Sequence, residues 1–195
     1  MEIQLLDIFQ FACWSFTYLL IIILGIKYKE CYMPPIASFL NFSWEIAALI
    51  IDFVKHLSLI IIIFHLTWII LDAFIIIITI KLSINKMKSI FFYSFVPFMV
   101  ASTIILFKYI GQLEICFLID IIMALSFVFC MIKINKNAYS CIIIGILKLL
   151  GDYFAYIVYS TNIFVYYIGK IVLIINFLYL QNALRVIIKK VFIKI

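Results

Sequence analysis

The sequence predicts an all-α integral membrane protein, a seven-transmembrane-helix bundle built as a single domain over residues 1–195. The chain is 69% hydrophobic and only 12% charged, and its mean hydropathy of +1.32 lies far outside the range of soluble globular domains. Apolar runs of about 20 residues, enough to cross a hydrocarbon core of about 30 Å, follow one another along the chain. The polar breaks between these runs are short, so neighbouring helices should pack antiparallel.

The breaks define the spans in order. The N-terminal segment MEIQLLDIFQ lacks the basic leader and cleavage site of a secretory signal, so we expect the first apolar run to be kept as a span. The following breaks are KYKECY, VKH, KLSINKMK, KYIGQ, KINKN and YSTN. The predicted spans are residues 5–26, 33–53, 57–80, 89–107, 112–132, 138–159 and 163–184.

Basic residues predict the orientation of the bundle. Eleven lysines and arginines fall in the loops of one side, whereas the other side holds only Lys55 and Lys108. Because cytoplasmic loops carry the excess of basic residues, the N-terminus should lie outside and the C-terminus in the cytoplasm. The net charge of +6 is then charge at the membrane surface, with lipids and no nucleic acid as the expected partner. We expect a multi-pass protein of a bacterial cell membrane.

The five cysteines are scattered, mostly within apolar runs, and we interpret them as small hydrophobic residues. There is no second histidine or cysteine pair at metal-ligand spacing, and no paired acidic motif suited to magnesium. The sequence therefore predicts no metal and no cofactor.

Ionisable residues inside the spans are candidates for a functional site, because burying them in a membrane is costly. Counting along each helix from the cytoplasmic edge places Glu45 at a depth of about 18 Å and Asp72 at about 14 Å. Lys148 and Asn176 fall at the same level. The result is a predicted polar layer near the midplane across the second, third, sixth and seventh spans. The carboxyls predicted nearer the outer surface are Asp7, Asp52, Glu114 and Asp120.

Helical spacing groups these side chains on shared faces. Asn41 and Glu45 lie on one stripe of the second span, and His65, Trp68 and Asp72 on one stripe of the third. We interpret His65 as a hydrogen-bonded interior histidine. On the sixth span, Lys148 and Asp152 are four residues apart, which favours an intrahelical ion pair.

Glu45 has no basic residue within one turn on its own helix, so its carboxyl needs another explanation. Desolvation in an apolar cavity favours a neutral carboxyl, which can act as a general acid at neutral pH. An acid in a pocket walled by Trp, Tyr and Phe suits the protonation of an alkene or epoxide of an isoprenoid, because aromatic faces stabilise the carbocation.

The segment MPPIASFLNFSWEIAALI resembles the second span of the integral-membrane terpene cyclases of the paspaline-forming type, from fungal indole-diterpene and meroterpenoid pathways. Asn41, Trp44 and Glu45 match that family's Asn-x-x-Trp-Glu signature, which follows a proline-containing stretch. FHLTWIILDAFIIIITIK resembles the third span of the family, with Trp68 and Asp72 in register, and ILKLLGDYFAYIVY resembles the sixth. These stretches cover about a third of the chain.

The resemblance implies that a glutamate of the second span and an aspartate of the seventh are the acid residues. Glu45 matches the first, but the best match for the aspartate is Asn176, with Tyr179 after it. Because asparagine cannot deliver a proton, either Glu45 works with Asp72 or Asp152, or the chemistry differs from that of the family, or cyclase activity has been lost.

The leading hypothesis is a terpene cyclase-like enzyme, of isomerase or lyase type, that acts on a prenylated or polyprenyl lipid. Glu45 and Asp72 are its predicted catalytic residues. The predicted substrate-binding residues are Asn41, Trp44, Trp68, Asp152, Asn176 and Tyr179. One alternative is a small proton-coupled transporter, in which the buried ionisable groups form a relay. Another is a structural or immunity-type membrane protein, in which the same groups hold helices together by hydrogen bonds.

Overall fold

The computed structural model describes residues 5–56, 58–83, 85–133 and 138–192, and every regular element in these ranges is an α-helix. The helices are α1 (Leu5–Tyr28), α2 (Pro35–Val54), α3 (Leu59–Leu82), α4 (Lys86–Tyr93), α5 (Val96–Tyr109), α6 (Gln112–Lys133), α7 (Ala138–Tyr159) and α8 (Ile163–Phe192). With α4 and α5 taken together, this part of the chain has seven helices long and apolar enough to cross a membrane. The predicted all-α architecture and the predicted number of helices long and apolar enough to cross a membrane are confirmed.

The fourth predicted span is divided into two helices. α4 ends at Tyr93 and α5 begins at Val96, with Pro97 in the first turn of α5. Proline has no backbone N–H and its ring clashes with the preceding helical turn, so it is tolerated in a first turn but not inside a helix. Pro97 therefore explains the break, which the apolar pattern alone does not predict.

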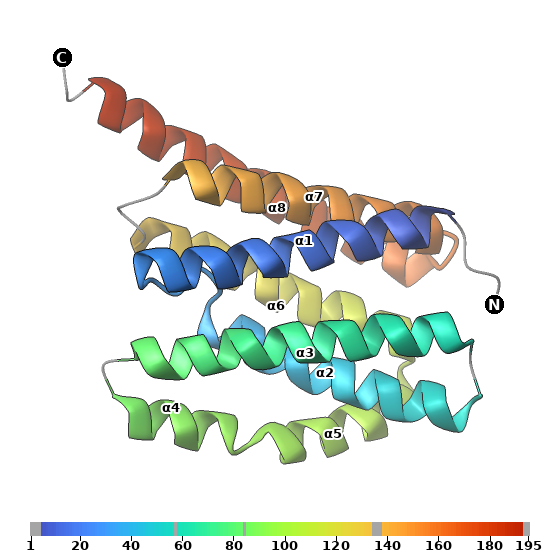
Figure 1. Ribbon diagram of the computed structural model, residues 1–195. Coiled ribbons are helices and arrows are strands. Elements are labelled where there is room, and N and C mark those ends of the chain that lie inside the picture. The colour runs from blue at the N-terminus through green and yellow to red at the C-terminus, as the bar shows by residue number, and fades with distance from the viewer. Residues whose placement is uncertain (1–4, 57, 84, 134–137, 193–195) are drawn as a thin grey trace.

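The helices lie side by side in one bundle (Figure 1). α1 packs against α3 and α7, α8 packs against α6 and α7, and α2 contacts α3, α5 and α6. The start of α1 and the α2–α3 connection lie at one end of the bundle, and the C-terminal part of α8 extends from the other end. α2 is the most deeply buried of the long apolar helices in the described ranges, and it carries the Asn41 and Glu45 stripe.

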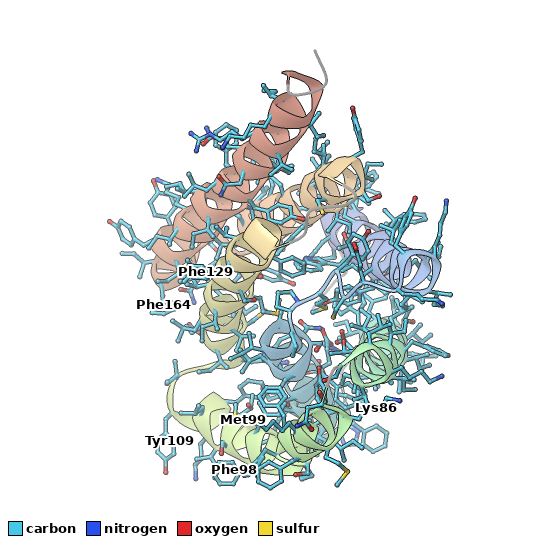
Figure 2. All side chains as sticks on the ribbon, turned by 90° about the vertical axis from the view of Figure 1, so that its left-hand side faces the viewer. Lys86, Phe98, Met99, Tyr109, Phe129 and Phe164 are labelled. Carbon is cyan, nitrogen blue, oxygen red and sulfur yellow. The ribbon has the colours of Figure 1, made fainter. Side chains whose placement is uncertain are left out.

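Many polar groups lie inside this bundle, and many large apolar side chains lie on its outside. Phe98 and Tyr109 on α5 and Phe129 on α6 are examples of exposed aromatic residues on its periphery (Figure 2). The buried polar and charged residues include Asn41, Glu45, Asp52, His65, Asp72, Lys148, Asp152 and Asn176. Such a distribution is the reverse of that in soluble proteins and is the one expected of helices surrounded by lipid.

Candidate functional site

A cavity of about 360 Å³ lies among α1, α2, α3, α6 and α7. The aromatic residues that line it are Trp14, Tyr18, Trp44, Phe64, Trp68, Phe117 and Tyr159. Its lining also contains five carboxyls, which belong to Asp7, Glu45, Asp52, Asp120 and Asp152. The cavity extends to Lys55, an exposed residue directly after α2. It therefore reaches from the interior toward the end of the bundle that holds the α2–α3 connection.

Three buried side chains form a chain of polar contacts in the cavity wall. Glu45 and Asp52 are seven residues apart on α2, which places them on the same face about two turns apart. His65 of α3 lies between them. Its Nδ1 is 2.5 Å from Oε2 of Glu45, and its Nε2 is 3.0 Å from Oδ2 of Asp52. Gln112 of α6 donates from Nε2 to Oδ1 of Asp52 over 3.1 Å.

The contacts of His65 limit where protons can lie in this chain. A ring nitrogen facing a carboxylate oxygen must carry a hydrogen, unless the carboxyl on that side is protonated and donates instead. His65 is therefore an imidazolium that donates to both carboxyls, or a neutral ring that accepts from one of them. In both cases a titratable proton lies within hydrogen-bond distance of Glu45.

Asp72 reaches the cavity through Asn41. The amide Nδ2 of Asn41 donates to Oδ2 of Asp72 over 2.6 Å, and both side chains are buried. Oδ1 of Asp72 has no hydrogen-bond partner among the described residues. Asn41 lines the cavity, whereas Asp72 is not one of its lining residues. Asp72 thus acts on the cavity by fixing the orientation of the Asn41 amide.

A second buried polar cluster joins α6, α7 and α8. Nζ of Lys148 is 2.8 Å from Oδ2 of Asp152 and 3.4 Å from Oδ1 of Asp120. Nδ2 of Asn176 donates to the same Oδ2 of Asp152 over 2.5 Å. Nζ of Lys148 also lies 4.8 Å from the centre of the Trp14 ring, within the range of a cation–π contact. The predicted intrahelical ion pair between Lys148 and Asp152 is confirmed.

Two tryptophans stand beside the Glu45 and His65 pair. The ring of Trp44 lies 5.5 Å from the His65 ring, and the ring of Trp68 lies 6.1 Å from it. Both line the cavity, and neither indole Nε1 has a hydrogen-bond partner within the described ranges. The Glu45 and His65 pair thus lies next to two large π surfaces.

The structure brings five of the eight predicted site residues to one cavity. Asn41, Trp44, Glu45, Trp68 and Asp152 line it.

The other three, Asp72, Asn176 and Tyr179, are not among the lining residues. Asn176 orients Asp152, because α8 packs against α7 and α6 and the Asn176 amide donates to the Asp152 carboxyl. Tyr179 is buried against the ring of Phe127, with the ring centres 6.0 Å apart.

The sequence interpretation missed several residues of this site. Asp52 and Asp120 were expected nearer the outer surface, apart from the polar layer, yet they line the same cavity as Glu45. The seven-residue spacing of Glu45 and Asp52 was a signal that could have joined them. Trp14 and Tyr18 of α1 carry no such signal, because a single apolar helix does not reveal which face it turns inward.

The side chains of the cavity suit proton transfer more than metal binding. Among the residues that the structure describes, no group of three or more His, Cys, Asp or Glu side chains is arranged to hold a metal ion. Both nitrogens of His65 are engaged by carboxyls. The arrangement provides a buried carboxyl, an imidazole ring next to it and aromatic side chains in the wall, which together can protonate an apolar molecule and stabilise a cation.

No protein-family model matches this chain, and comparisons with curated proteins and with solved structures also give no match. The resemblance to the membrane terpene cyclases therefore stays a prediction that rests on the sequence segments quoted above.

Proposed function

We propose that the chain spans a membrane as a seven-helix bundle, with its N-terminus outside and its C-terminus in the cytoplasm. Many large apolar side chains are exposed, while Glu45, Asp72, Lys148 and Asp152 within the helices are buried, which suits a lipid surrounding. The eleven-to-two distribution of basic residues between the two sides supports the orientation. On this basis the α2–α3 connection and Lys55 lie at the outer surface. A multi-pass protein of a bacterial cell membrane fits this arrangement.

Within the membrane, the protein acts as a terpene cyclase-like enzyme that protonates an isoprenoid lipid and lets it cyclise. The observation that carries this proposal is the position of Glu45, a buried carboxyl in the wall of a cavity that aromatic side chains such as Trp44 and Trp68 also line. The cavity volume of about 360 Å³ lies within the range of about 300–1,000 Å³ that is typical of small-molecule sites. An apolar substrate would enter it from the lipid.

Each part of the cavity has a role in this reaction. Glu45 gives its proton to an alkene or epoxide, and the π faces of Trp44 and Trp68 stabilise the carbocation that results. Cyclisation ends when a carbon of the cation loses a proton to a base, so the product is an isomer of the substrate. Asp152 lines the cavity and Asp72 does not, which supports Asp152 as that base. Asn41, held by Asp72, orients the substrate.

The test is product analysis by mass spectrometry, using membranes that contain the protein and are fed with prenylated and epoxidised prenyl lipids. We expect an isomer of unchanged mass from the wild type and none from Glu45→Gln, because an amide cannot donate a proton to carbon. Glu114→Gln is the matched control. Glu114 lies at the start of α6, bonds Asn162 over 2.7 Å and does not line the cavity. An isomer formed equally by the Glu45→Gln variant would refute the proposal.

A proton-coupled transporter is the second candidate, and the contacts among Asp52, His65 and Glu45 favour it. These contacts place three titratable side chains in a row, which leads from the end of the cavity at Lys55 toward the interior of the bundle. This candidate predicts solute flux in proteoliposomes that is driven by a pH gradient and stops in Glu45→Gln, with no isomer formed from any lipid. The product analysis above therefore separates the two candidates.

A further inference from the structure

We propose that His65, held as an imidazolium by Asp52, is the positioning residue that makes Glu45 acidic enough to protonate a hydrocarbon inside the membrane. This inference rests on the proposed role of Glu45 as the acid. It identifies the group that stabilises the carboxylate left behind when the proton has gone.

Proton donation from a buried carboxyl has an electrostatic cost. When Glu45 protonates an alkene, its O–H bond breaks, the π electrons of the alkene form a new C–H bond, and the neighbouring carbon becomes cationic. A carboxylate then remains in an apolar cavity, where an uncompensated anion is strongly disfavoured. Glu45 has no basic residue within one turn on its own helix. The acid therefore needs a cation from another helix.

His65 is that cation in the geometry of the site. His65 is on α3, the helix adjacent to α2, and its Nδ1 lies 2.5 Å from Oε2 of Glu45. Its Nε2 lies 3.0 Å from Oδ2 of Asp52, so a second carboxylate compensates the charge of the ring. Before the reaction, a neutral Glu45, a cationic His65 and an anionic Asp52 sum to zero charge. A buried group of zero net charge is less costly than one that carries a net charge.

The same geometry indicates which oxygen of Glu45 carries the proton. Oε2 accepts the N–H of the His65 ring, so Oε1 is the oxygen left to hold the acidic hydrogen. After transfer, the new carboxylate is already paired with the imidazolium, and no heavy atom has to move. Stabilisation arranged in advance of the charge is the form of electrostatic catalysis that proteins use most effectively.

The other charges around His65 favour its cationic form. His65 faces Glu45 and Asp52 of α2, and Asp72 lies seven residues after His65 on the same helix, α3. The remaining titratable residues that line the same cavity are Asp7 and Tyr18 on α1, Lys55 after α2, Cys116 and Asp120 on α6, and Asp152 and Tyr159 on α7; Asp152 is paired with Lys148. Carboxyls outnumber amines in this set, so the surroundings stabilise a cation.

Nitrogen NMR of the full-length protein, labelled with ¹⁵N-histidine in detergent or nanodiscs at pH 7, tests the protonation state directly. The chain has two histidines, and the other, His56, is an exposed residue between α2 and α3 with a φ of 52°. We expect both ring nitrogens of His65 to give imidazolium shifts, and the ring to become neutral in Asp52→Asn. A neutral His65 ring in the wild type would overturn the inference, whatever the activity of the protein.

Kinetics test the consequence for the acid. We expect His65→Gln to lower kcat by roughly 100-fold or more with little change in KM, because the amide keeps a hydrogen bond but not the charge. Added imidazole should restore part of the activity of His65→Gly, while His56→Asn stays as active as the wild type. Unfolding temperatures separate these effects from misfolding. A folded His65→Gln variant with wild-type kcat would contradict the inference, whereas a wild type without any product would contradict the cyclase proposal and leave the NMR result standing.

Discussion

At the scale of single residues, the environment of Glu45 separates what the sequence reveals from what it does not. The sequence identifies the carboxyl as costly, because no basic residue on its own helix compensates it. It does not identify His65 as the partner, since the two residues are 20 positions apart and meet only where α2 packs on α3. The Lys148 and Asp152 pair was predictable because both partners are on one helix.

Lys148 provides a stability prediction at this scale. Lys148 and Asp152 are buried, and Asp120 has only 14% of its side chain exposed. Replacing Lys148 by Met leaves two carboxylates without their cation, and we expect a loss of about 3–5 kcal/mol in the free energy of unfolding. Reversible unfolding of the purified protein in mixed micelles measures this loss.

The double variant Lys148→Met with Asp152→Leu is the control. It removes the Asp152 charge together with the lysine, so it should recover part of the lost stability, while Asp120 still lacks its cation and Asn176 lacks its hydrogen-bond acceptor. A Lys148→Met variant as stable as the wild type would show that the pair contributes nothing to the fold.

At the scale of helices, small residues determine which side chains reach the cavity. A Cβ atom placed on Gly151 of α7 would lie 2.8 Å from Cδ1 of Trp14 on α1. The absence of a side chain at this position lets α1 approach α7 and places the Trp14 ring against both Lys148 and the cavity. Gly151 and Trp14 are 137 positions apart in the sequence, so the periodicity of a single helix cannot predict their contact.

The helices themselves were largely predictable, because length and apolar composition are local properties. The structure departs from the predicted helices in two places. Pro97 divides the fourth span, and α8 continues to Phe192, past its predicted end at residue 184. Basic residues such as Arg185 and Lys189 suggested that the last span ends there, yet both remain helical. A helix does not have to end where its sequence becomes polar.

At the scale of the whole molecule, the orientation in the membrane is open to a labelling experiment. Lys86 and Lys108 are exposed and lie near opposite ends of the α4–α5 span. We expect a membrane-impermeant maleimide added outside intact cells to label Lys108→Cys but not Lys86→Cys, and to label both after the cells are opened. The reverse pattern would invert the proposed topology.

The native thiol between the first two spans should not obscure this measurement. Cys31 lies after α1, and burial raises the pKa of its thiol, although hydrogen bonding to Thr79 and Met33 acts against this shift. Because the thiolate is the reactive form, Cys31 should react slowly at pH 7 and faster as the pH rises toward the raised pKa. Labelling the wild-type protein under the same conditions gives the background.

The central claim is that Glu45 delivers a proton to carbon within the cavity, and its most direct test is solvent deuterium incorporation. Membranes containing the protein are equilibrated in D₂O and then given the lipid substrate, and the cyclised product is analysed by mass spectrometry. The account predicts that product formed by the wild type carries one deuterium from the acid at the carbon where cyclisation begins. A cyclised product with no deuterium at that carbon would contradict proton initiation and the role of Glu45 with it.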